Sequence, residues 1–154
     1  MSLQVPTMAE MIAKGESPDI LFWVGGFGSF DDRAKKITKA VVKILNHCNV
    51  SFAVLGTEES CSGDPAKRAG NEFTYQMQAM MNIQILNGYE VKKIVTACPH
   101  CFNTLKNEYP ELGGNYEVIN HTQLIQDLIN QGKLSLEKNE TFKGKKITFH
   151  DPCY

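Results

Sequence analysis

Short β-branched runs alternate along the chain with longer segments whose apolar residues recur at helical spacing. Residues 92–97 (Lys-Lys-Ile-Val-Thr-Ala) are typical of a buried strand, and Phe102, Leu105 and Tyr109 behind them have the spacing of a helix. The strands that the pattern predicts are residues 19–24, 50–55, 92–97, 116–120 and 146–150. The helices it predicts are residues 6–14, 32–47, 65–87, 102–109 and 121–130, and we expect a tight glycine loop over residues 25–30.

Strands that alternate with helices at this spacing favour a parallel sheet covered on both faces. We therefore expect an α/β fold: a doubly wound, Rossmann-like, mostly parallel sheet of about four to five strands with flanking helices. In the helix at 65–87 the apolar side chains of Phe73, Met77, Met80 and Met81 are predicted to fill the core.

Composition narrows the class of protein. The chain has 154 residues, of which 42% are hydrophobic, and a net charge of −1, so it offers no electrostatic case for nucleic acid or an anionic membrane surface. Its longest apolar run, residues 20–24, is too short to span a bilayer. Five cysteines without a secretion signal favour thiolate chemistry in a reducing compartment, which predicts a cytoplasmic location.

Cys98 and Cys101 form a C-x-x-C motif where a predicted strand gives way to a helix. In open α/β sheets ligands bind at this carboxyl edge, and an opening helix turn favours a thiolate. The motif is compatible with a metal or iron–sulfur site, with a thioredoxin-like dithiol pair, or with chance. Cys61 also follows a predicted strand, so we expect it at the same edge.

Three thiolates leave a four-ligand zinc or iron–sulfur site one ligand short. The place for a fourth is the loop after the first strand, where the sequence has Gly25 and Gly26. The same loop resembles a dinucleotide-binding turn, with the pair Glu58-Glu59 after the second strand. That motif lacks its third glycine, because Asp31 stands there.

Three segments carry a family resemblance: residues 56–73 (with Cys-Ser-Gly-Asp-Pro), residues 96–109 (with Cys-Pro-His-Cys-Phe) and residues 150–154 (His-Asp-Pro-Cys-Tyr). Together they resemble the cysteine-rich (CCG) domain of heterodisulfide reductase-related iron–sulfur oxidoreductases, the group that includes the glycolate oxidase iron–sulfur subunit. The match runs from about Leu21 to the C-terminus. In that family each module holds an iron–sulfur cluster, and two modules normally occur in tandem.

The resemblance implies roles for individual residues. Cys61, Cys98 and Cys101 are the expected cluster ligands, Ser62 replaces the second cysteine of the Cys-Cys-Gly loop, and Gly26 occupies the fourth ligand position. The isolated chain is therefore expected to be largely free of cluster. Cys153 matches the first cysteine of a second module.

The same resemblance divides the chain into parts. These are a helical lead-in at 1–18, partly of cloning origin, a first module at 19–145, and the first strand and cysteine loop of a truncated second module at 146–154. The implied protein is a larger oxidoreductase, and the isolated chain is expected to be inactive.

The implied function is electron transfer through a [4Fe-4S]-type cluster. The expected electron donor is a flavoprotein or dehydrogenase subunit, and the expected electron acceptor is a quinone or a disulfide. Binding to such partners could hold the protein at the inner face of the membrane. The alternative is a non-redox α/β scaffold with structural zinc or no metal.

Four further residues have predicted roles. His100 and His121 are candidates to line the site, and His150 is a candidate to support the Cys153 loop. Cys48 is interpreted as a structural thiol.

Overall fold

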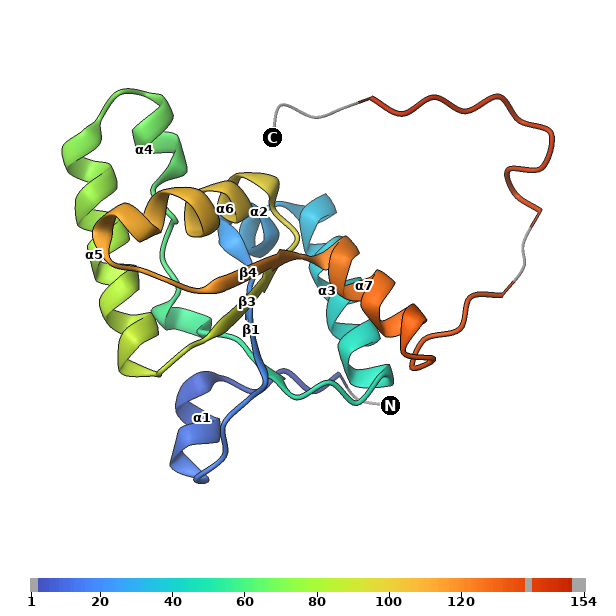
Figure 1. Cartoon of the computed structure of the whole chain (residues 1–154), viewed down its shortest axis with the longest axis horizontal. Coiled ribbons are helices and arrows are strands. Elements are labelled where there is room, and N and C mark those ends of the chain that lie inside the picture. The colour runs from blue at the N-terminus through green and yellow to red at the C-terminus, as the bar shows by residue number, and fades with distance from the viewer. Residues whose placement is uncertain (1–2, 138–139, 151–154) are drawn as a thin grey trace.

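A parallel four-stranded sheet forms the centre of the chain in a computed structural model that describes residues 3–137 and 140–150. The strands are β1 (Ile20–Trp23), β2 (Phe52–Ala53), β3 (Lys93–Thr96) and β4 (Glu117–Asn120), in the order β2-β1-β3-β4. All three strand pairs are parallel, with Leu21 opposite both Ala53 and Ile94. The predicted doubly wound α/β fold is confirmed (Figure 1).

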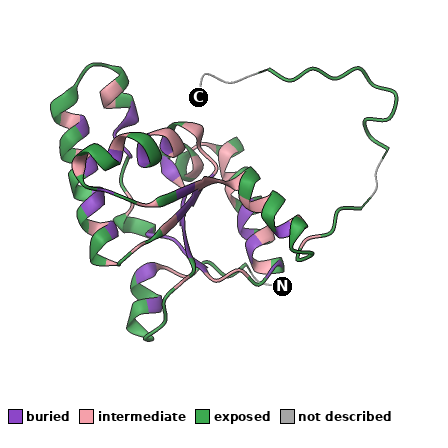
Figure 2. Cartoon of the chain, viewed as in Figure 1, coloured by how far each residue is buried: buried purple, intermediate pink, exposed green. Residues whose placement is uncertain are grey.

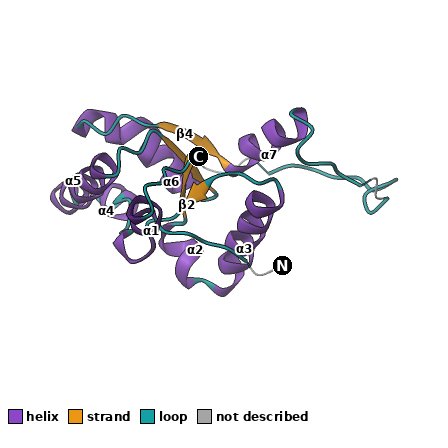
Figure 3. Cartoon of the chain, turned by 90° about the horizontal axis from the view of Figure 1, so that it is seen from below, coloured by secondary structure: helices purple, strands orange, loops and turns teal. Residues whose placement is uncertain are grey.

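Helices cover both faces of this sheet (Figures 1 and 3). The helices are α1 (Met8–Ala13), α2 (Gly25–Phe30), α3 (Asp32–His47), α4 (Asp64–Arg68), α5 (Glu72–Gly88), α6 (Pro99–Asn103) and α7 (His121–Asn130). Shorter turns are η1 (Gly56–Glu58), η2 (Thr104–Glu108), which is a π-helical turn, and η3 (Tyr109–Leu112).

Alternate residues of β1 separate the two halves of the core. Leu21 and Trp23 join a cluster that includes α5, η2 and α1, whereas Ile20 and Phe22 pack with α3 and with Leu124 of α7. A parallel strand buried on both faces needs apolar residues at every position, and all of β1 is buried. The edge strand β4 is less buried, and in Figure 2 it carries green and pink as well as purple.

Four sequence predictions need correction. Residues 25–30 form the short helix α2 rather than a loop, with Ser29 Oγ donating to the Gly25 carbonyl at 3.0 Å. The single helix expected at 65–87 is two, because Gly70 has a φ of +79° and Asn71 caps α5. Residues 146–150 are exposed and form no strand. Their assignment to a second module stays a prediction.

The fourth correction concerns the methionines of α5. Met77, Met80 and Met81 are 49%, 58% and 56% exposed, and Phe73 is 77% exposed. The buried face of α5 consists instead of Tyr75, Ala79, Asn82, Ile83 and Leu86. Within the described residues, no helix is both long and apolar enough to cross a membrane.

Candidate cysteine site

Three loops meet at the carboxyl edge of the sheet. A Cβ atom placed on Gly25, directly after β1 and its neighbour Val24, would lie 3.2 Å from Cys101 Sγ and 3.8 Å from Cys98 Cβ. The Ser62 side chain, from the segment that follows β2, hydrogen-bonds to the Cys101 thiol. The segments that follow β1, β2 and β3 therefore meet at this edge, while the convergence of Cys61 with Cys98 and Cys101 stays a prediction.

The C-x-x-C cysteines have unequal surroundings. Cys98 is partly exposed and is the N-cap residue of α6, while Cys101 is 6% exposed and lies within the first turns of that helix. A hydrogen bond from the Cys101 thiol, with further ones from the backbone N–H groups of Cys101 and His100, lowers the pKa of Cys98 to about 6. Because Cys101 donates to that thiolate and is buried, its own pKa is raised.

Cys61 directly precedes Ser62 in the segment that follows β2, but it is exposed. Its carbonyl accepts a hydrogen bond from Asn82 Nδ2 at 2.9 Å, and the same amide donates to Tyr109 Oη at 3.0 Å. Tyr109 Oη donates in turn to the Ser62 carbonyl at 3.0 Å, so buried polar groups hold the backbone of this loop. Sequence patterning missed Asn82, whose polar side chain points into the core.

The thiols are not gathered into a complete ligand set. In residues 3–137 and 140–150, no group of three or more His, Cys, Asp and Glu side chains is placed to hold a metal ion. The donor types fit an iron–sulfur cluster, since cysteine thiolates are its usual ligands. Ligation by Cys61 together with the C-x-x-C would require the exposed Cys61 side chain to turn toward Cys98 and Cys101.

Gly25 and Gly26 differ as positions for a fourth ligand. Gly25 has a φ of +76°, and a side chain there would crowd Cys101 Sγ. Gly26 has no positive φ, and its Cβ would have no atom within 4 Å. The open position is thus Gly26, the one that the family resemblance singles out.

One carboxylate attaches the glycine segment to the rest of the site. Glu59 Oε2 and Oε1 accept hydrogen bonds from the backbone N–H groups of Val24 at 3.0 Å and Gly25 at 2.6 Å. Burial raises the pKa of Glu59 to about 7 despite these bonds. In a dinucleotide-binding turn these N–H groups would face a phosphate, so their use by Glu59 counts against that alternative.

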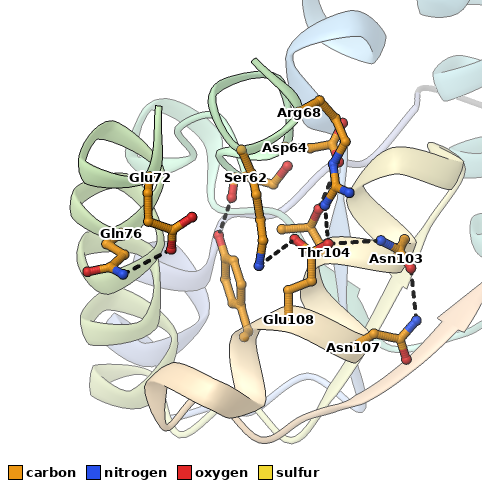
Figure 4. Close-up of polar contacts among 11 residues, drawn as sticks. Ser62, Asp64, Arg68, Glu72, Gln76, Asn103, Thr104, Asn107 and Glu108 are labelled. Carbon is orange, nitrogen blue, oxygen red and sulfur yellow. Dashed lines mark hydrogen bonds and ion pairs between the residues drawn. The ribbon is translucent and has the colours of Figure 1, made fainter. Parts of the chain in front are cut away.

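A buried carboxylate joins the helix after Cys61 to the helix of the C-x-x-C. Asp64 is 4% exposed; its oxygens accept from Thr104 Oγ1 at 3.3 Å and lie 3.1 Å from His100 Nδ1. Arg68 Nε lies 3.3 Å from Asp64 Oδ1, and Arg68 also pairs with Glu108 (Figure 4). We call Asp64, Arg68 and Glu108 the carboxylate clamp. It links α4 to η2, and through His100 to α6.

The remaining predicted residues fall in different places. The His121 ring hydrogen-bonds to the backbone of Thr96, two residues before Cys98, and burial lowers its pKa. Cys48 is buried and its thiol donates to the Lys133 carbonyl at 3.6 Å, as expected of a structural thiol. His150 is exposed, and Cys153 lies outside the described residues.

Comparison with known proteins places the chain in a family. Residues 21–106 match the profile of the cysteine-rich domain family termed CCG, and the chain belongs to that family. The resemblance drawn from the cysteine motifs is thereby confirmed.

Two relatives are equally similar in sequence, and a third is more distant. The chain is 46% identical over 153 residues to the probable iron-sulfur-binding oxidoreductase FadF of Bacillus subtilis, covering 98% of this chain and 21% of FadF. It is 46% identical over 140 residues to the EtfAB:quinone oxidoreductase of Syntrophomonas wolfei, covering 91% and 19%. It is 33% identical over 145 residues to one subunit of the dihydromethanophenazine:CoB--CoM heterodisulfide reductase of Methanosarcina barkeri, covering 90% and 34%.

The chain thus spans between 19% and 34% of the length of these relatives. Their names describe oxidoreductases, and FadF is named as iron-sulfur-binding. No solved structure matches the chain significantly.

Proposed function

We propose that this chain is an electron-transfer module of a heterodisulfide reductase-like iron–sulfur oxidoreductase. Cys61, Cys98 and Cys101 would hold a [4Fe-4S]-type cluster, with the fourth position left open at Gly26. The observation that carries the proposal is the contact of the C-x-x-C pair with Gly25 and Ser62, which brings three strand-end loops together at one sheet edge. Ligands bind at this edge in open α/β folds.

A bound cluster would supply one-electron transfer, and the protein would supply its sulfur ligands and their surroundings. The N–H groups of His100 and Cys101 already stabilise negative charge on Cys98. The carboxylate clamp holds the C-x-x-C helix against α4, which follows Cys61 closely in sequence. These contacts would hold the ligand-bearing segments in place whether or not the cluster is bound.

The relatives indicate the partners we propose. By analogy with the EtfAB:quinone oxidoreductase and the heterodisulfide reductase, electrons would come from a flavoprotein or dehydrogenase and pass to a quinone or a disulfide. These proteins are several times longer than the chain, so such an activity would belong to a larger assembly.

Anaerobic reconstitution with iron and sulfide tests the ligand set. We expect the chain to bind little iron, and Gly26→Cys to acquire a stable cluster seen by visible absorbance and EPR. Gly26→Ala is the matched control, because it fills the same open space without adding a sulfur. Cys98→Ser in the Gly26→Cys background should lose the cluster again.

Two results would contradict the proposal. If Gly26→Cys and Gly26→Ala bind equally little iron, the thiols do not converge on a cluster. If the chain instead binds one zinc ion with no visible chromophore, the scaffold alternative is correct, since a structural zinc site also uses cysteine ligands.

A further inference from the structure

Three methionines of helix α5 lie together on the face that points away from the core. Met77, Met80 and Met81 are about half exposed and belong to neither core cluster. Residues three and four positions apart on a helix have Cβ atoms about 5 to 6 Å from each other, so Met77 lies beside both Met80 and Met81. Each sulfur is carried on a long, unbranched side chain that can adjust its position.

The same three side chains line one groove. It has a volume of about 340 Å³ and is formed by α5 together with the end of η3. The lining residues are Met77, Met80, Met81, Ile83, Gln84 and Leu112. Ile83 is packed tightly on the side away from the groove, because a Cβ on Gly114 would lie 2.7 Å from Ile83 Cγ1. The methionines therefore have a fixed apolar wall beside them.

The groove also lacks charge. The six described residues that line it include no charged side chain, and α5 has no Asp, Glu, Lys or Arg after Glu72. Calcium and magnesium take oxygen ligands, mostly carboxylates, and the only side-chain oxygen in the lining is the Gln84 amide. Thioether sulfur is a soft ligand that selects soft ions such as Cu(I). The donor set thus favours a soft monovalent ion over a hard divalent one.

We propose that Met77, Met80 and Met81 bind one Cu(I) ion through their three thioether sulfurs. The helical spacing lets the three sulfurs approach the ion from one side, and the apolar side chains of Ile83 and Leu112 limit the access of water to it. None of the lining residues is a candidate cluster ligand, so this site does not rest on the proposed function. Ag(I) is an equally soft ion that does not change its oxidation state, and it serves as the probe.

Silver binding to the whole chain tests the site. The chain has five cysteines, whose thiolates also bind silver, so the quantity compared is the difference between variants. The variant Met77→Leu/Met80→Leu/Met81→Leu removes the three sulfurs and nearly conserves side-chain volume. Its matched control, Met8→Leu/Met11→Leu, removes two sulfurs from the interior. Reduced, iron-free protein is dialysed against silver nitrate, bound silver is measured by mass spectrometry, and circular dichroism confirms that each variant is folded.

We expect the triple variant to bind one silver ion fewer per chain than the parent and the control do. Each single leucine substitution should weaken the binding of this ion by about tenfold or more. In NMR spectra of the parent with labelled methionine methyl groups, the resonances of Met77, Met80 and Met81 should shift together as the ion binds. Those of Met8 and Met11 should stay in place.

Four results would overturn the inference. They are equal silver bound by the parent and the triple variant, an equal loss in Met8→Leu/Met11→Leu, a shift of only one of the three methyl resonances, and failure of excess Cu(I), added without oxygen, to displace the silver. Reconstitution of Gly26→Cys with iron and sulfide tests the thiols alone. The methionine site and the proposed function can therefore fail separately.

Discussion

Two loops occupy equivalent places in the fold but are built differently. The segment after β1 and the segment after β3 both leave the carboxyl edge of the sheet and enter a short helix, α2 or α6. The second begins with extended backbone at Cys98, and its helix is tied to α4 through Asp64. The first begins with Gly25 at positive φ and is joined to the segment after β2 through Glu59.

The difference shows where this fold places its buried polar contacts. Asp64 links the segment after Cys61 to the helix of the C-x-x-C, so the two cysteine-bearing segments are fixed relative to each other. The glycine segment after β1 is held instead by the carboxylate of Glu59. Breaking each link separately tests this contrast.

The largest expected effect is the loss of the carboxylate clamp. Asp64→Ala should lower the free energy of unfolding by about 3 to 4 kcal/mol, because it removes the buried partner of Arg68, His100 and Thr104. Urea denaturation measures the loss. The control is Asp32→Ala, which breaks the exposed pair with Lys35 and should cost no more than about 0.5 kcal/mol. Equal losses would mean that the clamp adds no stability.

The next largest effect is the pH dependence of stability that comes from Glu59, the side chain that binds the backbone of Val24 and Gly25. The pKa of Glu59 rises on folding, so the folded state favours its neutral form. Its contribution to stability is then present below about pH 4.5 and is lost as pH rises through about 7. We expect this loss to be about 2 kcal/mol, after allowance for partial solvent screening.

Denaturation of the chain and of Glu59→Gln at several pH values checks this assignment. Stability of the chain should fall more steeply than that of the variant between about pH 5 and 8, since glutamine does not titrate. Parallel slopes for the two proteins would show that Glu59 titrates alike in the folded and unfolded states.

A smaller effect separates the two glycines. Gly25→Ala should destabilise the fold by about 1 to 2 kcal/mol, because it adds a Cβ at positive φ and next to Cys101 Sγ. Gly26→Ala should be neutral within about 0.5 kcal/mol, since its backbone is helical and its surroundings are open. Thermal midpoints of the two variants give the comparison, and equal midpoints would refute it.

The last prediction concerns the reactivity of Cys98 rather than the stability of the fold. The pKa of Cys98 is about 6, so its alkylation rate by iodoacetamide should reach half its plateau near that pH. Cys101→Ser removes the thiol that donates to Cys98 and should move the half-point to higher pH. A half-point that does not move would show that the backbone N–H groups alone set the acidity of Cys98.

The sequence predicted those elements whose pattern has one interpretation. The amphipathic helix α3 (Asp32–His47) and the helix α7 (His121–Asn130) form over the expected residues, and β1 and β3 lie within their expected runs. The prediction of which α5 side chains fill the core was wrong, because this helix has apolar residues on all of its faces. Nothing in the pattern shows that Tyr75 and Ile83 face the sheet while Phe73 and Met80 face solvent. Long-range packing makes that choice.

The candidate site likewise contains residues that the sequence predicted and residues that it did not. The cysteines stand out by residue type and by their place after strands, so pattern alone finds them. Glu59, Asn82 and Asp64 act through contacts across 21 or more residues of sequence. Such contacts leave no local signal. In the sequence, Asp64 followed by Pro65 indicates only the start of a helix. Its partners His100 and Thr104 lie 36 and 40 residues further along the chain.

The exposed methionines of α5 have a consequence for oxidative damage. Met77, Met80 and Met81 are about half exposed, whereas Met8 and Met11 are 2% and 9% exposed. Peroxide should convert the first three to sulfoxides while the fold persists, because their new polar groups would face water. Helix α5 therefore presents a surface that can absorb oxidant and be repaired by reductases, while the methionines in the interior are spared.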